Sequence, residues 1–503
     1  AYVKDKVEEL EEKFPLHEAV LSMVIKHHPP PHVAQKYRIP AIWKGDLDSE
    51  LGKALLNCDD KGPVVMMLTN IVVDPQAGVV ATGRLFSGTV ESGIKLNLLG
   101  EKREGRIQSV NIFMGAAREI VDKISAGNIP ALLGLEYARA GETISTVKDV
   151  HLFENIRYVS EPVVQVAVES KHPRELPKLV EAMRRLSIED PNLVVKINEE
   201  SGEMLMAGMG LLHLEVATTL LQDAGLEIIT SEPLINYRET IQGRAGPFMS
   251  KSPNRHNKIF MRIEPLTPEV IEVIRTGKIH ENMDKKEMTM ILREKGWGTD
   301  ESKKVVGLDE RGNLFVDGTK GVQFLQESLD SMRAGFTDVM TNGPLAYEYC
   351  RGLKVILHHY VPHEDPAHRT YAQLMPATRR GILGAALSAK PVLLEPILGI
   401  EIKCTAEQIG AVSGVISSKR GKMLNVEQKG VLTMIDGEVP ASETFDLSQS
   451  MRGATSGKAI WNTHFKAWSP APKSVMSEIV SDIRKRKGLD PEPPRASEFI
   501  DKE

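Results

Sequence analysis

Short β-rich runs of mainly apolar residues follow one another in the first part of the chain. Turn-forming pairs such as Asp-Pro, Ala-Gly and Ser-Gly separate these runs, which cover residues 64–73, 79–88, 93–100 and 103–115. Many short strands with frequent turns are typical of a β-barrel or a β-sandwich. The pattern therefore predicts a β-barrel domain over residues 44–155.

Two later segments share another order of apolar patterns, in which strand-like and helix-like periodicities follow one another. In the first, these stretches lie at residues 162–170, 176–186, 192–200, 204–209, 214–221 and 226–232. In the second, they lie at 396–404, 409–416, 422–430 and 431–439, in a helical stretch from Ser442, and at 459–468. The order β-α-β-β-α-β is that of the split βαβ or ferredoxin-like fold. We therefore predict two ferredoxin-like domains, over residues 156–235 and 393–470.

The helices of both segments are indicated by apolar residues three and four positions apart. In the first segment these are Leu176, Leu179, Val180, Met183 and Leu186, and then Leu214, Ala217 and Leu221. In the second segment they are Ile409, Val412, Val415 and Ile416. We expect these side chains to be buried.

Residues 236–392 follow neither plan and are predicted to form an α+β domain between the two ferredoxin-like domains. A long helix carries one apolar stripe, made of Val322, Leu325, Leu329, Met332, Phe336 and Val339. A strand-like run at 351–359 leads through a Pro-rich loop into a helix over 374–390. We expect the striped helix to cover a sheet that contains this strand. The fold class is thus multidomain α+β.

Amphipathic helices are also predicted at the two ends of the chain. Near the start, Leu16, Val20, Met23 and Val24 share one face, and three prolines at 29–31 end the helix. A linker without periodicity follows at 32–46. Near the end, the apolar residues are Val475, Ile479 and Ile483. We predict that this last segment, 471–503, packs back on the 236–392 domain.

The four basic residues at 484–487, in the last turn of the C-terminal helix, have two explanations. Cations at this position complement the helix dipole, which needs no ligand. The same cluster could bind RNA. The sequence leaves both explanations open.

The composition indicates a multidomain globular protein. A chain of 503 residues with 41% hydrophobic residues is long enough for three to five domains, and it has no apolar run near 18 residues. The net charge of −5 is small, so any contact with nucleic acid must come from local basic patches. Cys58, Cys350 and Cys404 are far apart, which fits a reducing compartment. No signal peptide is visible, and because the chain begins at Ala1 within a helical pattern, we expect a fragment or a processed product.

Two kinds of chemistry are disfavoured. The chain contains no G-x-x-x-x-G-K-[ST] motif, so it has no P-loop to hold nucleotide phosphates. His359 and His363 are four residues apart, but Pro362 lies between them and the first is on a strand, so a zinc pair is not expected. His213 and Glu215 point apart on a helix. We predict no catalytic residue and no metal site in this chain.

Two loops carry the candidate binding residues. Lys251, Arg255, His256 and Lys258 surround a Pro-Asn turn, and such a basic loop suits contacts with RNA phosphates. The stiff loop after the 351–359 strand holds His363, Glu364, Asp365, His368 and Arg369. The alternative for both loops is a solvated surface without a ligand.

The segment HEDPAHR at 363–369, followed by Gln373, resembles the tip loop of archaeal and eukaryotic translation elongation factor 2. Three further motifs resemble that family in the same order: residues 81–93 in the barrel, 201–216 in the first ferredoxin-like domain and 251–258 in the tip domain. The resemblance implies that His368 is the residue modified to diphthamide. Thr370 and Tyr371 depart from the family pattern, and we expect Tyr371 to pack against the loop or to stack on a base.

The resemblance covers essentially the whole chain. It implies that the chain is the part of an archaeal-type elongation factor 2 that follows the GTP-binding domain. Residues 1–43 would then be the end of that domain and a linker. The resemblance also implies GTP-dependent translocation of tRNA and mRNA on the ribosome, RNA contacts from Lys251, Arg255, His256, Lys258, His368 and Arg369, and a cytoplasmic monomer. GTP and Mg²⁺ would belong to the GTP-binding domain, and diphthamide-synthesis enzymes are further partners. The alternative is a ribosome- or RNA-binding protein that natively lacks a GTPase domain.

Overall fold

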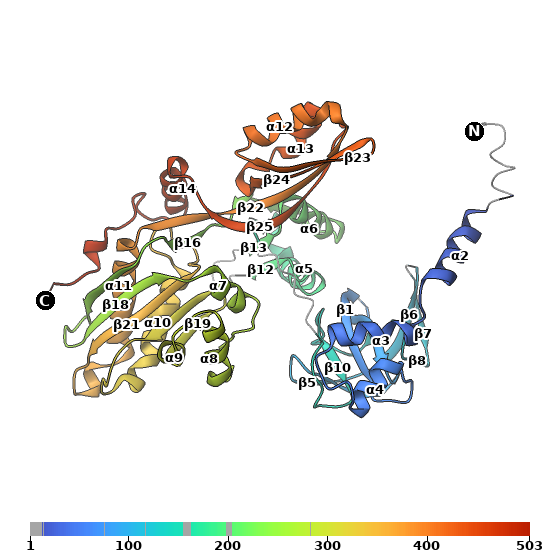
Figure 1. The fold of residues 1–503 in the computed structure, drawn as a ribbon, viewed down its shortest axis with the longest axis horizontal. Coiled ribbons are helices and arrows are strands. Elements are labelled where there is room, and N and C mark those ends of the chain that lie inside the picture. The colour runs from blue at the N-terminus through green and yellow to red at the C-terminus, as the bar shows by residue number, and fades with distance from the viewer. Residues whose placement is uncertain are drawn as a thin grey trace. The chain divides into compact units, whose positions relative to one another are not determined.

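The computed structural model describes residues 13, 15–74, 76–115, 117–153, 162–197, 204–281 and 283–502. The chain forms two compact units. The first contains Ala1–Glu161, Val166–Gly208 and Leu212–Ser231, and the second contains Pro162–Gln165, Met209–Leu211 and Glu232–Glu503. Figure 1 shows the ribbon, coloured from blue at the N-terminus to red at the C-terminus.

Some predictions lie partly outside the described residues. They are the N-terminal helix before Lys13, the boundary at 155–156, the end of the strand at 192–200 and the first three residues of the 201–216 motif.

Among the residues that the structure describes, three helices precede the barrel: α2 (Leu16–His27), α3 (Pro31–Ile42) and α4 (Glu50–Asn57). Helix α2 ends before the prolines, as predicted. Helix α3 occupies most of the stretch 32–46, which was predicted as a linker without periodicity. Pro31 stands in the first turn of α3, where its missing N–H is not needed, and Gln35 and Ile39 are buried. Helix α4 was not predicted; the Ser49 side chain caps it by accepting the Gly52 N–H at 2.9 Å.

The predicted barrel is confirmed as a curled eight-stranded sheet with the order β5-β4-β10-β1-β2-β9-β6-β7. Its strands are β1 (Val65–Asp74), β2 (Gly78–Ser87), β4 (Lys95–Leu98), β5 (Arg103–Arg106), β6 (Ser109–Met114), β7 (Ala117–Val121), β9 (Ala131–Leu133) and β10 (Thr143–Ser145). A separate ribbon pairs β3 (Thr89–Glu91) with β8 (Lys123–Ser125). The core of this domain includes Met66, Leu68, Leu85, Leu96 and Ile144.

Two glycines of the 81–93 motif have clear backbone roles. A Cβ atom on Gly83 would lie 2.0 Å from the carbonyl oxygen of Met67 on the paired strand β1, so only glycine fits there. Gly88 has a φ of 82°, in the left-handed region that L side chains rarely adopt. Gly83 therefore allows the close pairing of β1 with β2, and Gly88 allows the turn after β2.

The first ferredoxin-like domain is confirmed. It contains β11 (Val164–Ser170), α5 (Leu176–Glu189), β12 (Val194–Ile197), β13 (Met204–Gly208), α6 (Leu211–Asp223) and β14 (Ile228–Thr230), with the sheet order β12-β13-β11-β14. The short strand β15 (Leu234–Ile235) also pairs with β11. The predicted apolar residues are buried except Leu176, which is exposed because it is the first residue of α5, and Val180, which is half-buried.

The second ferredoxin-like domain has the same order of elements. These are β22 (Pro391–Cys404), α12 (Ile409–Ser418), β23 (Lys422–Lys429), β24 (Leu432–Pro440), α13 (Leu447–Thr455) and β25 (Ile460–Pro470). Strand β22 pairs with β24 and β25, and its beginning also pairs with β16 (Arg238–Ile241). The second helix starts at Leu447 and not at Ser442, because Ala441–Glu443 form a 3-10 turn first.

The α+β domain contains a five-stranded sheet with the order β17-β18-β21-β20-β19. Its strands are β17 (Ala245–Lys251), β18 (Lys258–Pro265), β19 (Val305–Asp309), β20 (Asn313–Asp317) and β21 (Leu353–Val361). Its helices are α7 (Pro268–Arg275), α8 (Lys285–Glu294), α9 (Thr299–Ser302), α10 (Leu325–Thr341) and α11 (Tyr371–Ser388). We call this part, residues 236–392, the tip domain.

Both faces of the tip sheet are buried. Val355 and Leu357 of β21 belong to the core under α10 and α11, as their period of two predicted. Ile356, between them, packs on the other face with Val270 of α7 and Leu292 of α8. Helix α10 begins at Leu325, so Val322 precedes it, and α11 begins at Tyr371, three residues before the predicted start.

The C-terminal helix α14 (Lys473–Arg486) buries Val480 and Ile483 against Leu345, Ala346 and Leu393. Val475 is half-buried and lies outside this cluster, so the predicted stripe was shifted by part of a turn.

Two of the four basic residues at its end are structural. Arg484 Nη1 donates to the carbonyl of Leu345 at 2.8 Å, and Lys487 Nζ donates to the carbonyl of Ala346 at 3.0 Å. Within the part of the chain that the structure describes, no helix is both long and apolar enough to cross a membrane.

Candidate functional site

The two loops singled out in the sequence meet at one end of the tip sheet. The first joins β17 to β18, and the second joins β21 to α11. Strands β18 and β21 are antiparallel neighbours, and their pairing places Lys258 opposite Val361, so the two loops leave the sheet at the same edge. We call them the first tip loop, residues 252–257, and the second tip loop, residues 362–370.

The first tip loop is held by its own polar side chains. Ser252 Oγ accepts the backbone N–H of Asn257 at 3.0 Å and donates to Asn254 Oδ1 at 2.6 Å. Asn254 Oδ1 also accepts the N–H of His256 at 3.1 Å. Arg255 has a φ of 62°, so the turn forces this residue into the left-handed region and leaves its side chain exposed.

The second tip loop contains one turn of 3-10 helix, Pro366–His368. Asp365 caps it, with Oδ1 accepting the N–H of Ala367 at 2.9 Å. His363 Nδ1 accepts the N–H of Asp365 at 3.1 Å, which gives the neutral ring its proton on Nε2. The loop is therefore an ordered turn with local hydrogen bonds.

Hydrogen bonds join the two loops to each other. Asn257 Nδ2 donates to the carbonyl of His368 at 2.7 Å, and Asn257 Oδ1 accepts the N–H of His363 at 3.0 Å. The N–H of Asn254 donates to Gln373 Oε1, in the first turn of α11, at 2.9 Å. Gln373, the last residue of the sequence motif, thus ties the start of α11 to the first loop.

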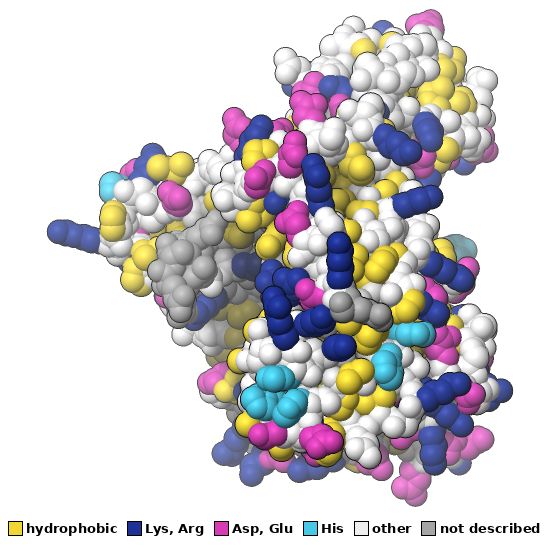
Figure 2. Space-filling view, turned by 90° about the vertical axis from the view of Figure 1, so that its left-hand side faces the viewer, with side chains coloured by type: hydrophobic (Ala, Val, Ile, Leu, Met, Phe, Trp, Pro, Cys, Tyr) yellow, Lys and Arg dark blue, Asp and Glu magenta, His cyan; other side chains and the backbone are white. Residues whose placement is uncertain are grey.

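Three histidines gather where the loops meet. The ring centres of His256 and His368 are 4.6 Å apart, those of His363 and His368 4.5 Å, and those of His256 and His363 5.0 Å. His256 is exposed, and the other two are half-buried. A compact group of histidine side chains with acidic neighbours is visible on the face drawn in Figure 2. Among the described ranges, no three His, Cys, Asp or Glu residues are arranged to hold a metal ion.

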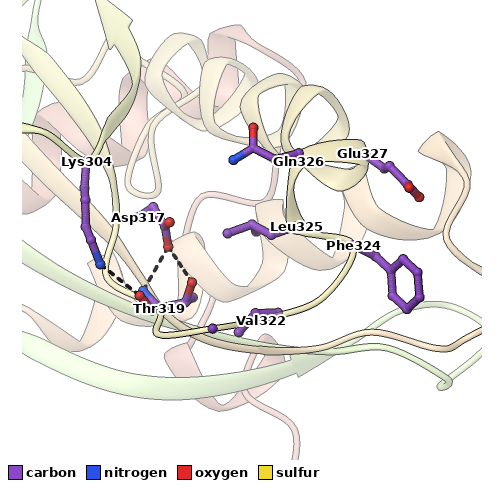
Figure 3. A pocket seen from close by; sticks show the side chains of 9 residues that line it. Lys304, Asp317, Thr319, Val322, Phe324, Leu325, Gln326 and Glu327 are labelled. Carbon is purple, nitrogen blue, oxygen red and sulfur yellow. Dashed lines mark hydrogen bonds between the residues drawn. The ribbon is translucent and has the colours of Figure 1, made fainter.

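Arg369 points into the protein, away from the surface on which the sequence led us to expect it. Its side chain is only 4% exposed, its Cζ lies 4.0 Å from the centre of the Phe324 ring, and Nη2 lies 3.3 Å from Glu327 Oε2. Phe324 and Glu327 flank the start of α10. Both side chains also line an open pocket of about 430 Å³, and Figure 3 shows them on the side of it opposite Lys304 and Asp317.

The start of the second loop is fixed to α10 as well. Tyr360, buried near the end of β21, has its hydroxyl 3.1 Å from Ser328 Oγ. Burial raises the pKa of Tyr360, so the phenol keeps its proton and can share it in this bond. Tyr360 before the loop and Arg369 at its end therefore attach both ends of the loop to the first turns of α10.

Lys251 is engaged by the C-terminal segment. Its backbone N–H donates to Asp501 Oδ2 at 2.7 Å, and its ammonium donates to the carbonyl of Lys502 at 2.9 Å. Arg255 is exposed and Lys258 half-buried. The structure thus brings His256 and His368 together with Arg255 nearby in sequence, while Lys251 and Arg369 have partners inside the protein.

Sequence reasoning missed the residues that organise the site. Ser252, Asn254, Asn257 and Gln373 make most of the hydrogen bonds within and between the loops. All four lie within the motifs at 251–258 and 363–373, but all are uncharged, and the sequence pointed to the charged residues as the ones that bind RNA. The signal was the presence of two asparagines three residues apart beside a proline, which suits turns and capping.

Four family models match: "Elongation factor Tu domain 2" at residues 78–145, "Elongation Factor G, domain III" at 159–232, "Elongation factor G, domain IV" at 277–390 and "Elongation factor G C-terminus" at 392–488. The first three fall on the barrel, the first ferredoxin-like domain and the tip domain, and the last covers the second ferredoxin-like domain together with α14.

Curated relatives match over the full length of the chain. Elongation factor 2 of Cenarchaeum symbiosum is 59% identical over 503 residues, which are 100% of this chain and 69% of the relative. Elongation factor 2 of Staphylothermus marinus is 51% identical and that of Sulfurisphaera tokodaii 50%, each covering 99% of this chain and 68% of the relative. The resemblance found in the sequence is confirmed, and the alternative of a ribosome- or RNA-binding protein that natively lacks a GTPase domain is not favoured. The chain belongs to the elongation factor 2 family and is a translation elongation factor.

Proposed function

We propose that the two tip loops form the end of the tip domain that contacts RNA in the ribosome during translocation, with His368 at the point of deepest penetration. The observation that carries this proposal is the contact between the loops. Asn257 Nδ2 lies 2.7 Å from the carbonyl oxygen of His368, and the rings of His256 and His368 are 4.6 Å apart. Two segments more than a hundred residues apart are thereby combined into one projecting surface.

The side chains at this surface suit a polyanion more than a small substrate. Arg255 is exposed and offers a fixed cation for phosphate oxygens, and Lys258 lies at the base of the same loop. Imidazole rings stack on bases and donate hydrogen bonds to phosphates. We assign RNA contacts to Arg255, His256, Lys258 and His368, and we assign Arg369 and Lys251 to holding the loops in place.

His368 is also our candidate for modification to diphthamide. Its backbone is bonded on both sides, while its ring stays half-exposed beside two other rings. A rigid main chain with an accessible ring suits a residue that a modifying enzyme must reach. Thr370 begins α11 as its N-cap, and Tyr371 is 59% exposed, so Tyr371 is free to stack on a base.

The remaining partners follow from the family. The ribosome is the partner of elongation factor 2 relatives, and we propose that this chain acts there on tRNA and mRNA in the cytoplasm as a monomer. GTP and Mg²⁺ do not fit the residues present, because the sequence has no phosphate-binding loop. We therefore assign both to a GTP-binding domain that precedes the region aligned here, and calorimetry should detect no saturable GTP binding to this chain.

The domain limits remain part of the proposal. They are 1–43, 44–155, 156–235, 236–392, 393–470 and 471–503. Limited proteolysis that cuts near these limits would support them.

Photo-cross-linking tests the proposed RNA contact. A benzophenone amino acid is placed at Tyr371, beside the second tip loop, and in a second variant at Tyr37 in α3. Both tyrosines are 59% exposed, so the reactive groups are equally accessible. Ribosome complexes carrying the group at position 371 should cross-link to small-subunit RNA of the decoding region, and those carrying it at position 37 should not. Absence of that cross-link from position 371 would contradict the proposal.

A further inference from the structure

Asn257 occupies the centre of the contact between the tip loops, and its side chain is fully buried. Its two amide hydrogens donate to the carbonyl of His368 at 2.7 Å and to Ser252 Oγ at 3.1 Å. Its carbonyl oxygen accepts the N–H of His363 at 3.0 Å. A carboxamide offers two donors and one acceptor oxygen, so every polar group of this side chain is used.

These bonds fix the main chain around both histidines of the second loop. The N–H of His363 and the carbonyl of His368 both bond to the planar carboxamide of Asn257, which fixes the distance between these two main-chain groups. Within the loop, the N–H of His368 donates to the carbonyl of Asp365 at 3.1 Å. The next residue is Arg369, whose side chain is buried against Phe324 and Glu327. The main chain on both sides of the His368 side chain is thus held in place, which fixes the point from which the ring leaves the loop.

Neither aspartate nor alanine supplies the same set of bonds. Aspartate has the same shape, but an ionised carboxylate only accepts, so it would face the His368 carbonyl with an oxygen. Alanine removes all three bonds and leaves the His363 N–H without its acceptor. A buried polar group that loses its partner is costly, so the loop would have to rearrange.

We propose that Asn257 is a positioning residue that sets the place of His368 and His363 in the tip. It acts through the backbone of the second loop and does not itself touch RNA, because it is buried. Its effect on translocation rests on the function proposed above, whereas its effect on the histidines does not.

Asn313 offers a matched control in the same domain. It is also a fully buried asparagine: Nδ2 donates to the carbonyl of Cys350 at 2.8 Å, and Oδ1 accepts the N–H of Leu353 at 3.0 Å. It lies at the start of β20, opposite the beginning of β21, while the tip loops follow the end of β21. Asn257→Ala and Asn313→Ala therefore remove comparable buried bonds at opposite ends of one sheet.

The first experiment measures hydrogen exchange at the C2 position of each histidine by mass spectrometry in the folded chain. In Asn257→Ala and Asn257→Asp, the exchange rates of His363 and His368 should change severalfold, and in Asn313→Ala they should match the parent. Unchanged rates in both Asn257 variants, or equal changes in Asn313→Ala, would overturn the proposal. Because the readout is taken below the unfolding transition of each variant, loss of stability alone does not produce the expected pattern.

The second experiment measures translocation on the ribosome, with the same substitutions made in the factor that includes its GTP-binding domain. Asn257→Ala should slow translocation as much as His368→Ala does, and Asn313→Ala should leave it close to the parental rate. If His368→Ala itself has no effect, the proposed function fails, yet the exchange rates still decide whether Asn257 positions the histidines. If His368→Ala slows translocation and Asn257→Ala does not, the positioning role is wrong.

Discussion

The guanidinium of Arg369 lies 4.0 Å from the centre of the Phe324 ring, in a pocket that leaves only 4% of its side chain exposed. This contact connects the last residue of the 363–369 motif to the start of α10. It explains why an arginine can follow the candidate modified histidine without reaching the surface. The contact supports the proposal that Arg369 holds the loop in place.

Arg369→Ala is therefore expected to destabilise the tip domain and not to alter the surface charge. The loss of the cation–π contact and of the ion pair with Glu327 should lower the free energy of unfolding by about 2 kcal/mol. Arg369→Lys should recover little of it, because an ammonium lacks the planar face that stacks on Phe324. Denaturant unfolding measures both effects. A parental midpoint for Arg369→Ala would show that the contact contributes nothing.

Arg255 and Lys258 are expected to carry the salt dependence of ribosome binding. Each cation that contacts a phosphate releases counterions, so Arg255→Ala should reduce the slope of log affinity against log salt by about 1. Lys251→Ala serves as the comparison, because the Lys251 ammonium donates to the Lys502 carbonyl. Its slope should equal that of the parent. The assignment fails if Lys251→Ala changes the slope and Arg255→Ala does not.

Glu239 should make the stability of the second unit depend on pH. This carboxylate is buried and accepts the backbone N–H groups of Leu345, Ala346 and Glu348, and burial raises its pKa to about 7. The folded state then binds the proton more tightly than the unfolded chain, whose ordinary value is 4.5. Its contribution to stability is present below about pH 4.5 and is lost as the pH rises to about 7, by about 3 kcal/mol in all.

Glu239→Gln tests this dependence, because glutamine does not titrate. The variant should be less stable at low pH, since its NH₂ group cannot accept from the 345–348 segment. Between about pH 4.5 and 7, however, its unfolding free energy should follow a flatter curve than that of the parent. Denaturant titrations at several pH values give the two curves. Parallel curves would rule out Glu239 as the titrating group.

The apolar face of α14 is expected to contribute to the stability of the second unit. Ile483 is 3% exposed and packs with Leu345 and Leu393, so Ile483→Ala should lower the free energy of unfolding by about 2–4 kcal/mol. Val475 lies on the same helix outside this cluster, and Val475→Ala should cost less than about 1 kcal/mol. Equal effects of the two substitutions would mean that the helix does not dock through Ile483.

Much of the fold could be predicted because the apolar periodicity was strong. Leu353, Val355 and Leu357 alternate and do lie in one core, and the two βαββαβ orders appear as sheets of the expected connectivity. Helix α3 could not be predicted in this way, since only Gln35 and Ile39 are buried along it and Pro40 lies within it. A short helix with so narrow a buried face leaves no periodic signal.

The position of the candidate site could be predicted from the sequence, but the contacts of its side chains could not. Both loops could be singled out, because prolines and clustered polar residues mark stiff turns. The direction of each side chain depends on tertiary neighbours: Arg369 turns inward because Phe324 and Glu327 are there to receive it. Lys251 is engaged because the C-terminal segment reaches β17. Neither neighbour is close to these residues in the sequence.

The most direct test of the central claim is the rate of translocation after a single change, His368→Ala, in the ribosome-active factor with its GTP-binding domain. If the tip acts on RNA through His368, translocation should slow by about tenfold, equivalent to about 1.4 kcal/mol of transition-state stabilisation. Ribosome-stimulated GTP hydrolysis should stay near the parental rate, because the P-loop motif that holds nucleotide phosphates is absent from this sequence. A variant that translocates at the parental rate would contradict the account, and so would one that loses GTP hydrolysis to the same extent as translocation.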